Sequence, residues 1–179
     1  MDEIETEPKM ERTKLQKTQK ASRGLGFLDR TFTAKLEVIK KLRTLGLTPY
    51  NPVLNWDKQD KDDVLARSKD DYFFRIRCRY ATVIREEDRS HRVKVVMYTG
   101  RRPKEEASQR DTFRKRLATL KSRTDIVALF VPGGGPFKRP RIFWIPADEI
   151  DGTKSVISFP ALKLRDEYEE FPWEAFYQT

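Results

Sequence analysis

Residues 125–131 (DIVALFV) constrain the fold of this chain more than any other segment. A short, continuous apolar run is typical of a strand that is buried on both faces of a sheet. Residues 132–140 (PGGGPFKRP) are rich in turn residues, and residues 141–145 (RIFWI) are the expected antiparallel partner strand. The glycine run is not a P-loop, because no Gly-Lys-Ser/Thr sequence follows it and no helix is predicted after it.

The other elements are predicted from periodicity and turn residues. From residue 32 to residue 45, apolar residues recur at helical spacing with basic residues between them, which indicates an amphipathic helix with a basic outer face. The helix and the strands together place the chain in the α/β class, as one domain. The apolar positions of this helix are Phe32, Leu36, Ile39 and Leu42, and Lys35, Lys40, Lys41 and Arg43 lie between them. Further strands are expected at residues 50–54, 64–66, 72–80, 93–98 (pairing with 72–80) and 154–159, and a capped helical turn at residues 146–150.

Residues 72–80 (YFFRIRCRY) alternate with the period of two that indicates a strand. Phe73, Arg75, Arg77 and Arg79 share one face, while the other face carries core-forming residues. Three guanidinium groups would then lie roughly 6.5–7 Å apart, a spacing similar to that of successive phosphates along one nucleic acid strand. Arginine binds phosphate through two parallel hydrogen bonds. The alternative is that nearby acids neutralise these arginines, and the candidates are Asp62, Asp63, Asp70 and Asp71.

A second basic segment spans residues 101–123, which hold nine lysine or arginine residues and three acidic residues. Phe113, Leu117 and Leu120 have the spacing of one apolar helical stripe, so the second half of the segment is predicted to be a helix. A solvated helix normally carries both signs of charge, so this segment is the second candidate for contact with nucleic acid. The basic residues assigned to that contact are Arg101, Arg102, Lys104, Arg110, Arg114, Lys115, Arg116, Lys121 and Arg123, together with Lys94 from the strand at 93–98.

The charge of the chain supports a polyanionic partner. Its formal net charge is +9, although residues 166–179 hold five acidic residues and no lysine or arginine. Most of the chain is therefore more basic than the total indicates, and a basic surface attracts nucleic acid. The alternative is a surface that is simply rich in lysine and arginine.

Several classes of protein are excluded by what the sequence lacks. No apolar run approaches the roughly 18 residues that span a bilayer, and the acidic N-terminus has no apolar signal region. We therefore expect no membrane association and a cytoplasmic location. Cys78 and His91 are the only cysteine and histidine, so an intramolecular disulfide, a zinc cluster and a Cys–His catalytic pair are not expected. No metal and no cofactor are predicted, except Mg²⁺ if the chain is a nuclease.

Two terminal segments flank the predicted domain, which covers residues 27–160. Residues 1–26 have a composition typical of a disordered basic arm. Residues 161–179 are interpreted as an acidic, aromatic tail that docks on a protein partner or on the chain's own nucleic acid site. The alternative is a tail that packs on its own core. The docking residues would be Phe171, Trp173, Phe176 and Tyr177.

The order of these motifs resembles the PD-(D/E)XK nuclease superfamily, in the branch of small group I intron homing endonucleases and archaeal relatives. The resemblance covers roughly residues 32–150 and is carried mainly by DIVALFVP, RIFWI and IPADEI. It implies a central mixed sheet flanked by helices, with the substrate cleft on the face of RIRCR. It places the metal-binding position of the family at Arg77 and the catalytic lysine at Arg79. The acidic positions fall at Asp63, or Asp62 by a one-residue slip, and near Lys35 with Glu37 close by.

These departures imply that the metal site is lost, because a guanidinium at a ligand position repels a divalent cation. The function expected from the sequence is therefore nucleic acid binding, to DNA, on a nuclease-like fold without catalysis. One alternative is an accessory subunit of a larger nucleoprotein complex such as a ribosome or polymerase. Another is an active Mg²⁺-dependent endonuclease that uses Asp63 with Glu37 or Asp62, and Lys94 as a displaced lysine. A homodimer is also an open alternative, because nucleases of this fold often pair.

Overall fold

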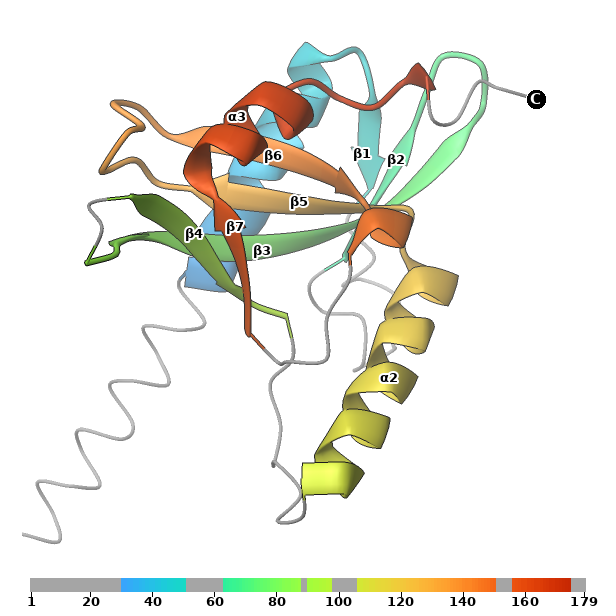
Figure 1. Ribbon diagram of the computed structural model, residues 1–179. Coiled ribbons are helices and arrows are strands. Elements are labelled where there is room, and N and C mark those ends of the chain that lie inside the picture. Colours follow the sequence, from blue (N-terminus) through green and yellow to red (C-terminus); the bar gives the residue numbers. More distant parts are fainter. Residues whose placement is uncertain (1–29, 51–62, 88–89, 98–105, 151–155, 175–179) are drawn as a thin grey trace, which may run out of the picture.

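The structure is a computed structural model that describes residues 30–50, 63–87, 90–97, 106–150 and 156–174 (Figure 1). It has the predicted α/β character: a seven-stranded mixed sheet with helices packed against it. No helix in these ranges is long and apolar enough to cross a membrane. A helix is described over residues 30–44 and is called the N-helix below. The other elements are β1 (Thr48–Tyr50), β2 (Asp63–Arg67), β3 (Phe73–Arg85), β4 (His91–Val96), α2 (Glu106–Arg123), β5 (Ile126–Val131), β6 (Arg141–Pro146), η2 (Ala147–Glu149), β7 (Val156–Pro160) and α3 (Ala161–Tyr168).

The long strand β3 organises the sheet. Its first part pairs antiparallel with β2 and its last part pairs antiparallel with β4, which confirms the predicted partner at residues 93–98. Between these parts β3 also pairs in parallel with β5, from Ile76 opposite Ile126 to Tyr80 opposite Phe130. Strand β1 extends the sheet beyond β2, β6 pairs antiparallel with β5, and β7 pairs antiparallel with β4. All six residues of β5 are buried, as its continuous apolar sequence predicts.

The alternation in β3 divides the sheet into two faces. Phe74, Ile76 and Cys78 pack with residues of the N-helix, and we call this side the N-helix face. Arg75, Arg77 and Arg79 point to the opposite side, where Ala81 continues the same row into the other core cluster. That cluster contains residues of α2 and α3, and we call this side the α2 face. The arginines predicted to share one face of a strand therefore lie on the α2 face.

The N-helix buries a stripe that overlaps the predicted one at Leu42 and, in part, at Ile39. Ala34, Val38 and Leu42 are fully buried, whereas Phe32 and Leu36 are 62% and 41% exposed. Lys35, predicted to lie on the outer face, is also buried. Leu36 is four residues after Phe32, and Val38 is four residues after Ala34. The sequence therefore allows two overlapping apolar stripes. The tight packing of the helix on the sheet selects the stripe with the smaller residue.

The hairpin between β5 and β6 has the predicted turn chemistry. Gly133, Gly134 and Gly135 all have positive φ angles, which residues with a Cβ atom rarely adopt. The first short strand is formed by residues 48–50 rather than 50–54, and residues 51–54 lie outside the described ranges. The turn at PADEI is the 3₁₀ helix η2, which has no side-chain cap although a capped turn was predicted.

The C-terminal segment packs on the domain, which is the alternative left open by the sequence. The burial of Phe171 contradicts its docking on a partner, and the partly buried Trp173 packs against the same cluster. In α3, Leu164 and Tyr168 are buried in the cluster on the α2 face. Phe171 is 6% exposed, and its ring centroid lies 5.1 Å from that of Trp144 and 4.5 Å from that of Trp173. The folded unit thus continues past the predicted boundary at residue 160. Phe176 and Tyr177, like the predicted arm at residues 1–26, lie outside the described residues.

Candidate nucleic-acid interface

Arg75 is held in place by an acid that the sequence analysis did not consider. Its Nη2 atom lies 2.7 Å from Oδ1 of Asp125, and its Nε atom lies 3.3 Å from both carboxylate oxygens. The Arg75 main-chain N–H donates to Oδ2 of Asp125 at 2.7 Å, and the Asp125 N–H donates to the Arg75 carbonyl at 2.8 Å. The side-chain hydrogen bond to Asp125 raises the pKa of Arg75 above its ordinary value.

The same guanidinium also contacts the end of α2. Nη1 of Arg75 donates to the main-chain carbonyl of Ser122 at 2.8 Å, in the last turn of that helix. Carbonyls at a helix C-terminus lack partners within the helix and attract positive charge. Arg75 therefore joins β3, α2 and the start of β5. For Arg75 the structure therefore shows the alternative of pairing with an acid, and the acid is Asp125 instead of Asp62, Asp63, Asp70 or Asp71.

Arg77 and Arg79 lie farther along the same face and are half-buried. In the ladder with β5, Arg77 is opposite Val127 and Arg79 is opposite Leu129, and both of these residues belong to the buried cluster. Nη1 of Arg79 donates to the Cys78 carbonyl at 2.9 Å. The two side chains thus border the core on the α2 face, and their contact with phosphate stays a prediction.

The helix α2 carries the most basic surface next to these arginines. Figure 1 shows that the C-terminal end of α2 meets the body of the protein, whereas its N-terminal end extends away from the sheet. Leu120 is buried, Leu117 packs against the same cluster, and residues 112–123 contain no acidic residue. The exposed basic residues are Arg114, Lys115 and Arg123, and Arg116 and Lys121 are half-buried.

These α2 cations have no acidic partner in the described part of the chain. Ion pairs are formed elsewhere, for example by Lys163 with Glu167 and by Arg67 with Asp71, but none involves a residue between Arg114 and Arg123. Lys121 donates from Nζ to the Asp148 carbonyl at 2.8 Å, which ties α2 to η2. Arg101, Arg102 and Lys104 lie outside the described residues, and so do the side chains of Arg110 and Phe113.

Lys94 does not belong to this surface. Val93 and Val95, its neighbours in β4, point into the cluster on the α2 face, so Lys94 points to the opposite side. Lys94 is paired with Thr82, and Thr82 points to the same side of β3 as Cys78, which is the side opposite to Arg79. Lys94 therefore does not share a face with Arg77 and Arg79, and its contact with nucleic acid and its use as a displaced catalytic lysine stay predictions.

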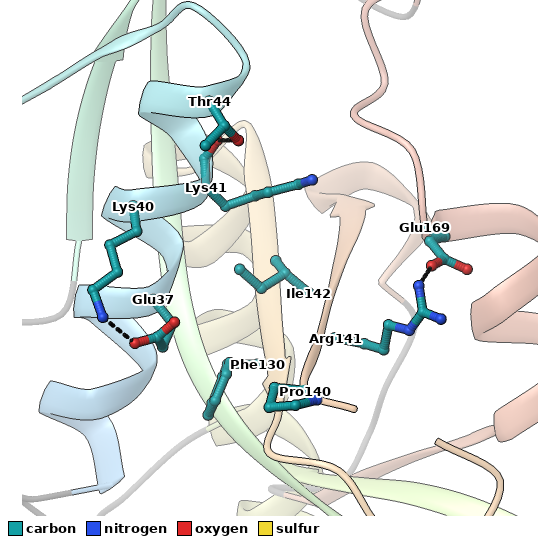
Figure 2. Close-up of a pocket in the computed structure, with 9 residues that line it drawn as sticks. All are labelled: Glu37, Lys40, Lys41, Thr44, Phe130, Pro140, Arg141, Ile142 and Glu169. Atoms are coloured by element: carbon teal, nitrogen blue, oxygen red, sulfur yellow. Dashed lines mark hydrogen bonds and ion pairs between the residues drawn. The ribbon is translucent and has the colours of Figure 1, made fainter. Parts of the chain in front are cut away.

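Glu37, one of the two vestigial acidic candidates, lines a pocket of about 340 Å³ on the N-helix face (Figure 2). Its Oε1 atom accepts a hydrogen bond from Lys40 Nζ at 2.6 Å. Asp63, the other candidate, begins β2 opposite Arg77, whereas the pocket is lined in β5 by Phe130. Arg77 is aligned with Val127, which is three residues before Phe130. Asp63 and the pocket are therefore separated by roughly 10 Å along the strand direction.

The charges around this pocket largely neutralise one another. Arg141 is paired with Glu169, as Lys40 is with Glu37. The Lys41 side chain extends from the N-helix across the pocket and has no hydrogen bond or ion pair from its ammonium to any described residue (Figure 2). Such a mixed, compensated lining does not have the strong single sign of charge found on α2.

The described acids do not form a metal centre. Within those ranges no group of three His, Cys, Asp or Glu side chains is placed to hold a metal ion. Comparisons with known protein families, with curated proteins and with solved structures found no match.

Three residues that matter for this surface were missed or undervalued in the sequence. Asp125 was treated only as the start of an apolar strand, although an acid directly before a strand was visible. Tyr50 was placed only in a short extended segment. Phe73 was assigned to the arginine face but given no role. In the structure the rings of Tyr50 and Phe73 are exposed.

Proposed function

We propose that this protein binds nucleic acid with the basic surface of α2, supported by Arg77 and Arg79 on the adjoining sheet. The observation that carries the proposal is the run of basic side chains from Arg114 to Arg123 that has no acidic partner in the described part of the chain. Like charges on one helix repel each other, and a bound polyanion removes that cost.

The shape of the surface favours a polymer over a small anion. The cations from Arg114 to Arg123 extend over ten residues of helix, a rise of roughly 13.5 Å, and α2 projects from the body of the protein (Figure 1). A chain of phosphates can contact several of these side chains at once. A small anion would meet only one or two, in full competition with water and salt.

We also propose that the fold is related to the PD-(D/E)XK nucleases but does not cleave its ligand. The described elements follow the order on which that resemblance depends, from the N-helix through β1, β2 and β3 to β5 and β6, which supports the relationship. Under this relationship, Arg77 and Arg79 replace a metal ligand and a catalytic lysine. Incubation with supercoiled, linear and branched DNA and Mg²⁺ or Mn²⁺ tests this part, because cutting that is lost in Asp63→Ala would contradict it.

Binding is tested with two variants of equal charge change. The first, Arg114→Gln with Lys115→Gln and Arg116→Gln, removes three cations from α2. The matched control removes two arginines and one lysine at exposed positions away from α2, by Arg43→Gln with Lys138→Gln and Arg139→Gln. We expect the α2 variant to lose at least tenfold in affinity for a DNA oligonucleotide, because about three phosphate contacts are removed, and the control to lose much less. Equal losses in the two variants would show that only net charge matters, and salt-independent binding would refute the proposal.

An accessory subunit of a nucleoprotein complex was the main alternative. Its docking element was the aromatic tail, but Phe171 and Trp173 are packed on the core. We therefore propose direct binding as the primary activity. Co-purification of the full chain with a defined complex, persisting in the α2 variant, is the observation that would favour the alternative.

A further inference from the structure

The α2 face continues beyond α2 onto strands β1, β2 and β3, where it carries exposed aromatic rings. Phe73 is 49% exposed and Tyr50 is 43% exposed, whereas Phe74, on the other face of the same strand, is fully buried. The strand registers define two rows of side chains on this part of the face. One row contains Thr48, Arg67 and Phe73, and the other contains Tyr50, Leu65 and Arg75.

An arginine lies between the two rings. Arg67 is directly opposite Phe73 in the ladder between β2 and β3. Interactions with Asp71 and then with Tyr50 raise the pKa of Arg67 above its ordinary value. The Nε atom of Arg67 donates to Oδ1 of Asp71 at 2.6 Å, so the arginine is held in one position. The two rings belong to strands separated by one other strand and to rows two residues apart, so their Cα atoms are roughly 12 Å apart.

This aromatic area is continuous with the basic surface. Arg75, in the same row as Tyr50, donates to the Ser122 carbonyl at the end of α2. Tyr50 therefore lies on the β1 side of Arg75, Phe73 lies two residues before Arg75 in β3, and the C-terminal end of α2 contacts Arg75 itself. A ligand that crosses this region meets phosphate-binding charge and flat apolar surfaces in turn.

We propose that Phe73 and Tyr50 stack against unpaired bases, so that the preferred ligand is single-stranded nucleic acid whose phosphates lie along α2. This inference rests on the proposed function and specifies its ligand. Aromatic side chains bind the faces of bases, and those faces are accessible in a single strand but covered by neighbouring base pairs in a duplex. Stacking of this kind tolerates any base, because every base has a π face.

The experiment uses the full-length chain with a short single-stranded oligonucleotide and the duplex of the same sequence. The oligonucleotide contains 2-aminopurine, whose fluorescence is quenched when the base stacks on an aromatic ring. Phe73→Leu and Tyr50→Leu remove each π face and keep an apolar side chain, which limits any effect on folding. Phe32→Leu, at a ring that is exposed on the N-helix, is the matched control.

We expect Phe73→Leu and Tyr50→Leu each to weaken single-strand binding about tenfold and to reduce the quenching, without changing duplex binding. The control Phe32→Leu should change neither the single-strand affinity nor the quenching. Unchanged single-strand affinity and quenching, with binding still lost in the α2 variant, would overturn this inference and leave the proposed function intact. Equal losses for single strand and duplex would also overturn it. Absence of salt-dependent binding to either nucleic acid would overturn both proposals.

Discussion

Arg75 and Asp125 are 50 residues apart in the sequence and are joined by side-chain and main-chain hydrogen bonds at once. Asp125 is the residue before β5, and Arg75 is the third residue of β3, so the pair lies where the parallel strands β3 and β5 begin to align. Since Arg75 also holds the end of α2 through Ser122, the same pair fixes the position of the basic helix.

Asp125→Ala should lower the free energy of unfolding by about 2 kcal/mol, because charge-assisted hydrogen bonds contribute roughly 1.5–3 kcal/mol. The carboxylate also accepts the Arg75 main-chain N–H, which the alanine variant leaves without this acceptor. Asp125→Asn keeps one acceptor oxygen and should lose less. Urea denaturation measures both values.

The control for this comparison is the exposed pair of Lys163 and Glu167, whose side chains are about half-exposed. Glu167→Gln should change stability by less than about 0.5 kcal/mol, because solvent screens such pairs. A loss in Asp125→Ala as small as this would show that the Arg75–Asp125 pair does not organise the fold.

Lys115→Gln should reduce the salt dependence of nucleic acid binding. Each phosphate contact contributes about 0.9 to the slope of log affinity against log salt for duplex DNA and about 0.7 for a single strand. The slope should therefore fall by less than one unit in this variant and remain unchanged in Lys138→Gln, at the exposed tip of the β5–β6 hairpin. Binding isotherms at several salt concentrations provide the slopes, and a wild-type slope in Lys115→Gln would remove this residue from the interface.

Phe171→Ala should lower the free energy of unfolding by about 3 kcal/mol, since truncation of a buried phenylalanine leaves a cavity. Phe171 packs against Phe74, Trp144 and Trp173, which belong to β3, β6 and the C-terminal segment. Leu162→Ala, at a position that is 61% exposed in α3, should change stability by less than about 0.5 kcal/mol. Thermal or urea unfolding distinguishes the two, and similar small losses would contradict the burial of Phe171.

Tyr168 should make stability depend on alkaline pH. Burial, and then its hydrogen bond to Glu149 (Oη to Oε2, 2.6 Å), raise the pKa of Tyr168 well above its ordinary value of 10.0. Because the folded state retains this proton more strongly than the unfolded chain, the stabilising contribution is complete below about pH 10 and is lost as the pH rises above it.

Tyr168→Phe should therefore be less stable than wild type by about 1 kcal/mol near neutral pH, and the difference should shrink above about pH 10. The measurement is urea denaturation of both proteins at a series of pH values. A difference that stays constant through this range would show that the hydroxyl of Tyr168 titrates alike in the folded and unfolded chains.

Local patterns in the sequence were sufficient for strands β3 and β5 and for the faces of their side chains. The alternation at residues 73–79 placed Phe73 and the three arginines on one side, because side-chain direction in a strand depends only on residue parity. The continuous apolar run of β5 predicted burial on both faces for a similar reason. The basic character of α2 was also visible, since the composition of residues 112–123 needs no tertiary information.

The use of each side chain was decided only by contacts between distant segments. Asp125 reaches Arg75 because β5 aligns in parallel with β3, and a strand carries no local signal for such a register. Phe171 enters the core because Phe74 and Trp144 leave an aromatic site there, although its acidic neighbours favoured exposure in the sequence. Ala34 rather than Phe32 faces the sheet because close packing selects between two helical stripes that the periodicity leaves equivalent.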